Sequence, residues 1–134
     1  MTERALLLVA LAGGILVIGK GFRWLIGNRQ ATIANSVQLP PSESRDPRVL
    51  LFTGPRCSTC ERQKAIVDQV TSHWPGGLCV DRIDAAEDPM AARAFGVMSV
   101  PTTVVIAPNG SISKITGGLV RADELERQLH AAVA

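Results

Sequence analysis

The sequence predicts an α/β domain in which helices flank a four-stranded mixed sheet, preceded by one N-terminal transmembrane helix. From Arg48 onward, short apolar runs alternate with helical patterns, in the order strand, helix, strand, helix, strand, strand, helix. Pro108-Asn109-Gly110 separates the last two strand candidates and is typical of a hairpin turn. An apolar run without charges covers residues 5–19. We therefore expect an anchor at 1–29, a linker at 30–47 and a folded domain at 48–134.

The anchor is predicted from the N-terminal apolar run. Extending the run to Ile26 gives a segment of the length that a bilayer requires, about 20 residues. The extension includes Lys20 and Arg23, whose long side chains can reach the headgroups. A cleaved signal peptide is the alternative, but basic residues stand where a small-residue cleavage site should lie. Basic residues after the span outnumber those before it, so the positive-inside rule places the domain in the cytoplasm. The margin is small, and an extracytoplasmic domain stays open.

Residues 30–47 contain several prolines and serines with little periodicity, which is typical of a linker. A short extra strand at residues 31–39 is the alternative. The domain then begins with a strand at residues 49–53. A helix follows at residues 58–72, and its pattern predicts that Ala65, Ile66 and Val70 face inward. The run Pro75-Gly76-Gly77 ends this helix and turns the chain.

The second half of the domain continues the alternation. We expect a strand at residues 78–84 and a helix at 87–95, with Pro89 in its first turn and Gly96 just past its end. Strands follow at residues 102–107 and 111–116, and a last helix at 121–133. Its apolar face is predicted to carry Leu125, Leu129 and Val133. A right-handed crossover makes the first two strands parallel, and the hairpin makes the last two antiparallel.

Two cysteines occupy the first turn of the helix at residues 58–72. Cys57 and Cys60 are close enough to interconvert between a dithiol and a disulfide. Backbone N–H groups and the helix dipole favour an anion at Cys57, and the adjacent Arg56 adds a positive charge. We expect both effects to lower the pKa of the Cys57 thiol. The pattern therefore predicts a redox pair, at the end of a strand where sites in such sheets open.

Three other interpretations of the pair stay open. A zinc site usually needs four ligands, and the chain has no second Cys-x-x-Cys motif or paired histidines. A structural disulfide more often closes a long loop. Two inert cysteines could also stand together by chance. A copper chaperone is a weaker possibility, because additional His or Met ligands are missing near the pair. We therefore expect no metal at this site.

The rest of the composition excludes several functions. The formal net charge is only +2, and no basic stripe interleaved with aromatic residues indicates nucleic acid. No glycine-rich dinucleotide motif follows a strand, so we expect no flavin or nicotinamide cofactor and infer that electrons arrive by thiol exchange. Cys79 is predicted to be a buried, inert thiol in the middle of a strand. His73 and His130 are predicted to lie at the surface near helix ends.

Three motifs together resemble the thioredoxin superfamily, in particular its membrane-anchored bacterial members. They are Cys57-Ser58-Thr59-Cys60, the run Gly96-Val97-Met98-Ser99-Val100-Pro101-Thr102, and Asn109-Gly110 followed by Gly117-Gly118. The resemblance covers residues 48–134. It implies that Cys57 is the attacking thiolate and Cys60 the buried resolving thiol. It also implies a cis peptide bond between Val100 and Pro101, with the backbone of Val100 pairing with an extended substrate.

Three features, at four positions, depart from the family pattern. Ser58-Thr59 replaces the Gly-Pro of reducing thioredoxins, and Arg56 replaces a tryptophan. The family's buried aspartate, six residues before the first cysteine, is Leu51 here. The resolving thiol therefore lacks its usual proton acceptor. Either Glu61 substitutes for it through water, or the exchange is slow. Because Arg56 should stabilise the Cys57 thiolate, we expect the disulfide to be more oxidising than that of a strong reductant.

The sequence thus predicts a membrane-anchored thiol–disulfide oxidoreductase that exchanges disulfides with the thiols of partner proteins. The alternative is a non-catalytic accessory subunit of a membrane protein complex, in which the glycine-rich span contacts neighbouring helices. Replacement of Cys57 distinguishes the two, because only the first function needs its thiol.

Overall fold

The computed structural model describes residues 13–15, 17–21 and 46–134. The chain divides into two units, Met1–Thr32 and Ile33–Ala134. In the first unit, residues 13–15 and 17–21 are helical and their side chains are exposed. Among the residues described, no helix combines the length and the apolar character needed to cross a bilayer. The remainder of the predicted span, the predicted linker up to residue 45 and the alternative strand at 31–39 lie outside the described residues.

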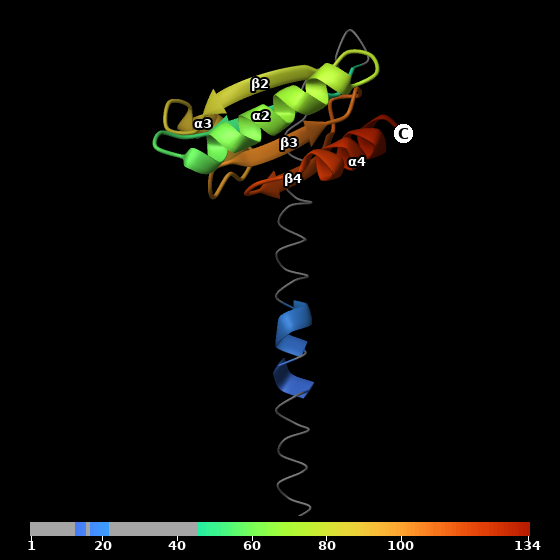
Figure 1. The fold of residues 1–134 in the computed structure, drawn as a ribbon. Coiled ribbons are helices and arrows are strands. Elements are labelled where there is room, and N and C mark those ends of the chain that lie inside the picture. Colours follow the sequence, from blue (N-terminus) through green and yellow to red (C-terminus); the bar gives the residue numbers. More distant parts are fainter. Residues whose placement is uncertain (1–12, 16, 22–45) are drawn as a thin grey trace, which may run out of the picture. The chain divides into compact units, whose positions relative to one another are not determined.

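The described part of the second unit has the predicted order of elements (Figure 1). The elements are β1 (Arg48–Thr53), α2 (Ser58–His73), β2 (Cys79–Asp84), α3 (Pro89–Ala94), β3 (Thr102–Ile106), β4 (Ile112–Gly117) and α4 (Ala122–Val133). The strands form one four-stranded sheet in the order β2-β1-β3-β4. β1 and β2 are parallel, and β3 is antiparallel to both β1 and β4. These directions confirm the predicted crossover and hairpin.

Helices cover both faces of the sheet. Alternate residues of a strand point to opposite faces, and the two core clusters follow this alternation. One cluster joins Val49, Leu51 and Val105 of the strands to side chains of α2 and α4. The other joins the intervening residues, among them Phe52 and Val104, to Ala92 of α3 and the adjoining Phe95. The first cluster therefore fixes α2, which carries the cysteine pair, on the same face as α4.

The buried face of α2 differs from the predicted one. Val70 is buried as expected, but Ala65 is exposed and Ile66 is only half-buried. The buried side chains are Cys60, Gln63, Val67 and Val70, at intervals of three and four residues. The error arose because Gln63 is polar. A pattern built on apolar residues alone placed the inward stripe about one position away from its true position.

Two further sequence expectations need correction. Cys79 is not in the middle of a strand, since it is the first residue of β2, and it is half-buried rather than buried. Val133 is the last residue of α4, where helix ends fray, and is 45% exposed rather than buried. The predicted linker also ends inside the domain: Pro47 is buried, and its carbonyl accepts a hydrogen bond of 3.1 Å from the Cys79 N–H.

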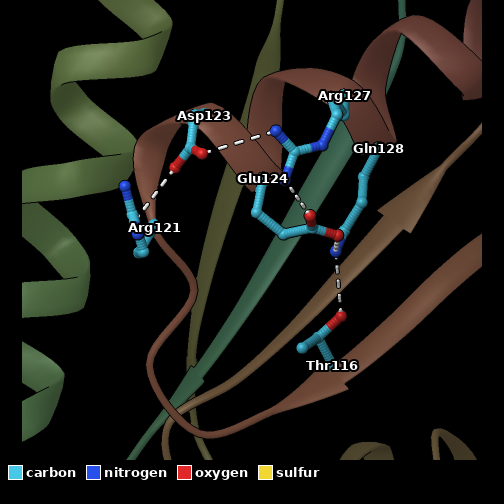
Figure 2. Close-up of polar contacts among 6 residues, drawn as sticks. All are labelled: Thr116, Arg121, Asp123, Glu124, Arg127 and Gln128. Carbon is cyan, nitrogen blue, oxygen red and sulfur yellow. Dashed lines mark hydrogen bonds and ion pairs between the residues drawn. The ribbon is translucent and has the colours of Figure 1, made fainter.

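A polar network joins the first turns of α4 to β4 (Figure 2). Arg127 forms ion pairs with Asp123 and Glu124, and Gln128 donates hydrogen bonds to Glu124 and, at 3.3 Å, to the Thr116 hydroxyl. Although burial acts to raise it, the pKa of Asp123 is held below its usual value by the charges of Arg121 and Arg127. The network therefore fixes the start of α4 to the last strand of the sheet.

Candidate functional site

The cysteine pair lies at the junction between β1 and α2. The strand ends at Thr53, and the chain turns through Gly54, Pro55 and Arg56 before α2 begins at Ser58. Arg56 has a φ of 58°, in the left-handed region that is sparsely populated by residues other than glycine. This conformation leaves Cys57 at the N-cap of α2. The site thus sits on a turn that is short and tightly constrained.

Cys57 and Cys60 form a disulfide across the first turn of α2, with their Cα atoms 5.3 Å apart. The Cys57 sulfur also accepts a hydrogen bond of 3.2 Å from the Cys60 N–H. A side chain that accepts a bond from the third residue on is the ordinary N-cap arrangement, here made by a sulfur atom. Because helix N-terminal N–H groups stabilise a negative charge, the same position favours the thiolate once the disulfide is reduced.

The two cysteines differ in exposure. Cys57 is half-buried and lies at the surface end of the helix, whereas only 1% of Cys60 is exposed. Ser58 and Thr59 between them are exposed. A thiol at position 57 is therefore accessible to another protein, and a thiol at position 60 is accessible only from within the site.

The opening of β3 lies against the cysteine turn. The Val100–Pro101 peptide bond is cis, as the resemblance implies. A Cβ atom added at Gly54 would lie 3.2 Å from a methyl carbon of Val100, so the two segments are in close contact. The adjoining backbone is fixed by two hydrogen bonds, from the Thr102 hydroxyl to the Ser99 carbonyl and from the Gly118 N–H to the Pro101 carbonyl. The structure thus brings Val100 and Pro101 together with the turn that carries the cysteines.

A shallow cavity of about 350 Å³ adjoins Val100. Its lining includes Val97, Met98 and Arg93, and the Met98 side chain is 96% exposed. Contiguous apolar surface that is exposed on a protein often marks a contact with a partner. The surface next to the cysteine pair is therefore apolar, with one positive charge at its margin.

The other predicted site residues lie at the surface. Arg56 is exposed beside Cys57. Glu61 is also exposed, and its carboxylate accepts a hydrogen bond of 2.7 Å from the Lys64 ammonium. Leu51 is fully buried within the apolar cluster beneath α2. Among residues 46–134, every buried polar side chain is a threonine or a glutamine, so no carboxyl group accompanies Cys60 into the core.

Gln63 is a buried residue of the site that the sequence analysis missed. Its side chain makes two hydrogen bonds with the main chain of Val120, accepting one of 2.6 Å from the N–H and donating one of 3.3 Å to the carbonyl. One helical turn beyond Cys60, Gln63 thus ties the cysteine helix to the loop that joins β4 to α4. The signal in the sequence was a polar residue at a spacing of three from Cys60 and four from Val67.

The comparison with protein families agrees with this geometry. The thioredoxin family model matches residues 32–131, and the chain belongs to the thioredoxin family. The match begins upstream of Arg48. The sequence had predicted that the domain starts at Arg48 itself. No group of three or more His, Cys, Asp or Glu side chains that could hold a metal ion occurs in the described part of the chain.

Individual relatives support the same assignment. The thioredoxin of Methanocaldococcus jannaschii is 35% identical over 68 residues, which are 51% of this chain and 76% of the relative. Thioredoxin 1 of a Nostoc species is 23% identical over 90 residues, covering 65% and 84% of the two chains. A mutant thioredoxin from Halobacterium salinarum superposes with a TM-score of 0.60 at 24% identity, over 67% of this chain and 77% of that one.

Family membership and the cysteine pair together define the activity. The chain is a thiol–disulfide oxidoreductase of the thioredoxin type, and Cys57 and Cys60 form its Cys-x-x-Cys pair. The predicted superfamily, the four-stranded mixed sheet and the class of enzyme are confirmed. Its partners are protein thiols and disulfides, since these are what thioredoxins act on.

Proposed function

We propose that this oxidoreductase is anchored in a membrane by residues 1–29, and that Cys57 attacks the partner while Cys60 resolves the mixed disulfide. The observation that carries the division of roles is the difference in exposure. Cys57 is half-buried at a helix N-cap, and Cys60 is 1% exposed. An attacking thiolate must reach the other protein and be stabilised as an anion, whereas a resolving thiol needs only to reach its neighbour.

The exchange proceeds in two balanced steps. The Cys57 thiolate attacks one sulfur of the partner's disulfide, forming a mixed disulfide and releasing the other partner sulfur as a thiolate. Cys60 then loses its proton and attacks the Cys57 sulfur, so the Cys57–Cys60 bond forms and the second partner thiolate leaves. The partner gains two electrons and the chain loses two; oxidation of a partner follows the same steps in reverse. Arg56 supports the first step by stabilising the Cys57 thiolate.

The partner binds as an extended segment along the opening of β3. The contact between the Val100 side chain and Gly54 supports this role, because it brings residue 100 next to the turn that carries Cys57. An extended peptide can add its main-chain hydrogen bonds to such an exposed backbone. The apolar surface at Val97 and Met98 then receives side chains that flank the partner's cysteine.

The anchor is supported by the sequence alone. Residues 5–19 are uncharged, and basic residues follow them, so we place the domain on the cytoplasmic side by the positive-inside rule. Extraction of membranes with alkaline carbonate tests the anchor: the full chain should stay in the membrane pellet, and its release to the supernatant contradicts the proposal. Labelling of the reduced Cys57 with an impermeant maleimide, in sealed vesicles of known orientation, tests on which side of the membrane the domain lies.

Serine variants of the full chain test the division of roles. Cys57→Ser should abolish reduction of a protein disulfide, whereas Cys60→Ser should accumulate mixed disulfides that a reducing gel dissolves. Cys79→Ser is the matched control, because Cys79 starts β2 at the end of the strands remote from the cysteine turn. It should leave both readouts unchanged. Full exchange activity in Cys57→Ser contradicts the proposal and favours a non-catalytic accessory subunit instead.

A further inference from the structure

One buried hydroxyl in the sheet has no role in the site described above. Thr103 is 0% exposed, and its hydroxyl oxygen makes no hydrogen bond with any described residue. The preceding residue offers a contrast, because the Thr102 hydroxyl donates a hydrogen bond of 2.6 Å to the Ser99 carbonyl. Buried polar groups in folded proteins mostly have a partner, and a redox or catalytic role is one explanation for a group that lacks one.

The register of the sheet places Thr103 beside Leu51. Thr103 lies opposite Leu51 of β1 on one side and Thr116 of β4 on the other. Because strand side chains alternate, Thr103 shares its face with Val105, which belongs to the core cluster beneath α2 and α4. The hydroxyl is therefore directed to the side of the sheet on which α2 carries Cys60. Thr103 thus lies beside Leu51, which stands at the position where the family pattern has a buried acid.

On α2, the other groups that face the sheet are already satisfied or apolar, whereas on α4 the buried amide oxygen of Gln128 also lacks a hydrogen-bond partner among the described residues. The inner face of α2 presents Cys60, Gln63, Val67 and Val70. Gln63 makes two hydrogen bonds with the main chain of Val120, so it is not a partner for Thr103. The two valines have no polar atoms in their side chains. The sulfur of Cys60 is the remaining group on this face of α2. Reduction of the disulfide increases its capacity to form hydrogen bonds.

The ionisable groups on the surrounding elements do not reach into this core. In the part of the chain that the structure describes, they lie at the surface and most are paired with one another: Glu61 with Lys64, Asp68 with Arg82, and Glu124 with Arg127. Lys114 of β4 is exposed. Cys57, at the helix N-cap, is the other thiol of the site. Of the polar side-chain groups on this face of the sheet, those directed into the core are therefore hydroxyl groups such as that of Thr103.

We propose that the Thr103 hydroxyl donates a hydrogen bond to the Cys60 sulfur in the reduced protein, directly or across one water molecule. This inference rests on the proposed role of Cys60 as the resolving thiol. The proton of Cys60 passes to solvent; Thr103 does not take it, but stabilises the thiolate that remains. The thiolate then attacks the Cys57 sulfur and expels the partner's thiolate. Hydrogen bonding to the charged form of a group favours that form, which makes resolution faster near neutral pH.

Reaction of the reduced full chain carrying Cys79→Ser with an equimolar amount of dithiobis(nitrobenzoate) tests the proposal, because it separates the two steps without a contribution from the free Cys79 thiol. Cys57 attacks the reagent and releases one nitrothiobenzoate; Cys60 then attacks the Cys57 adduct and releases a second. The rate of the second release, followed across a range of pH, reports the ionisation of Cys60. In Thr103→Val, which removes the hydroxyl and keeps the shape, we expect this release to slow about tenfold at neutral pH and its midpoint to rise by about one pH unit.

Matched variants separate this role from a structural one. Thr103→Ser keeps the hydroxyl and should retain the native pH profile, whereas Thr103→Ala should behave like Thr103→Val and replaces it if the valine variant does not fold. Thr116→Val is the control on the neighbouring strand, since the Thr116 hydroxyl is already bound by Gln128 (Figure 2). Glu61→Gln tests the alternative proton acceptor. A shifted profile in that variant, with none in the Thr103 variants, overturns the inference.

The same experiment distinguishes failure of the inference from failure of the proposed function. If the Cys79→Ser chain with Thr103 intact releases one nitrothiobenzoate and never a second, Cys60 is not a resolving thiol, and the proposed function fails. If both releases occur and Thr103→Val matches the native profile, the proposed function stands and the role of Thr103 is refuted.

Discussion

Removing the side-chain amide of Gln63 should destabilise the whole domain. Gln63 is 0% exposed and is the hydrogen-bond partner of both the N–H and the carbonyl of Val120, which is 2% exposed. In Gln63→Met the side chain keeps its length but loses both bonds. The two main-chain groups of Val120 are then buried without partners, because methionine offers neither the donor nor the acceptor that they require.

The size of the effect follows from these two groups. Each buried, unsatisfied group costs about 1–3 kcal/mol, and the apolar methionine side chain recovers about 1 kcal/mol through burial. We therefore expect Gln63→Met to lower the free energy of unfolding by about 1–5 kcal/mol. Urea titration of the oxidised full chain in mild detergent, followed by circular dichroism, measures this loss. Amide hydrogen exchange at Val120 gives a local readout of the same bonds.

Gln128→Met is the matched control. Gln128 is also buried, but it bonds the side chains of Thr116 and Glu124, and its amide oxygen has no partner among the described residues. Its two partners are half-buried and can bond water instead. We expect a loss within about 1 kcal/mol. Equal losses in the two variants, or a loss below 1 kcal/mol in Gln63→Met, would refute the reasoning.

Two further predictions concern the cysteine turn and the start of α4. Gly54→Ala places a methyl group 3.2 Å from Val100, so Val100 must shift. We expect exchange with a protein disulfide to slow several-fold, whereas stability to urea should change little. An unchanged exchange rate contradicts the proposed substrate contact. Hydrogen bonds from Gln128 and Arg127 hold the pKa of Glu124 below its usual value of 4.5. A lowered carboxyl pKa stabilises the fold above pH 4.5, and this contribution is lost as the pH falls through the lowered value. Arg127→Met should therefore reduce the free energy of unfolding at neutral pH and have less effect in acid. An equal loss of stability at the two pH values contradicts a role of Arg127 in lowering the pKa of Glu124.

Most of the fold could be predicted from local features of the sequence. Pro75-Gly76-Gly77 ends α2, and Pro89 and Gly96 bracket α3, because these residues act through their own backbone geometry. Asn109-Gly110 predicts the β3–β4 hairpin for the same reason. The direction of each strand then follows from the connections between them.

The burial of individual side chains was harder to predict. Ala65 was expected inside and is exposed, whereas Gln63 was not among the residues expected inside and is fully buried. Both errors have one cause: Gln63 is buried because its amide is satisfied by the main chain of Val120, 57 positions further along the chain. A pattern of local hydrophobicity contains no information about such a distant partner.

The candidate site divides in the same way. Cys57 and Cys60 were identifiable because a spacing of three on a helix places them together whatever the rest of the chain does. The cis peptide bond between Val100 and Pro101 was inferred from the resemblance and not from the residues themselves. Thr103 could not be identified at all, since its face and its neighbour Leu51 depend on the register between β1 and β3.

The measurement that tests the central claim most directly is the equilibrium of the full chain with glutathione buffers, read by counting free thiols. We predict one reversible two-electron transition that involves Cys57 and Cys60 and leaves Cys79 as a free thiol throughout. The same transition should survive in Cys79→Ser and disappear in Cys57→Ser. If no reversible disulfide forms between Cys57 and Cys60 in any buffer, the pair is not the redox centre of this protein.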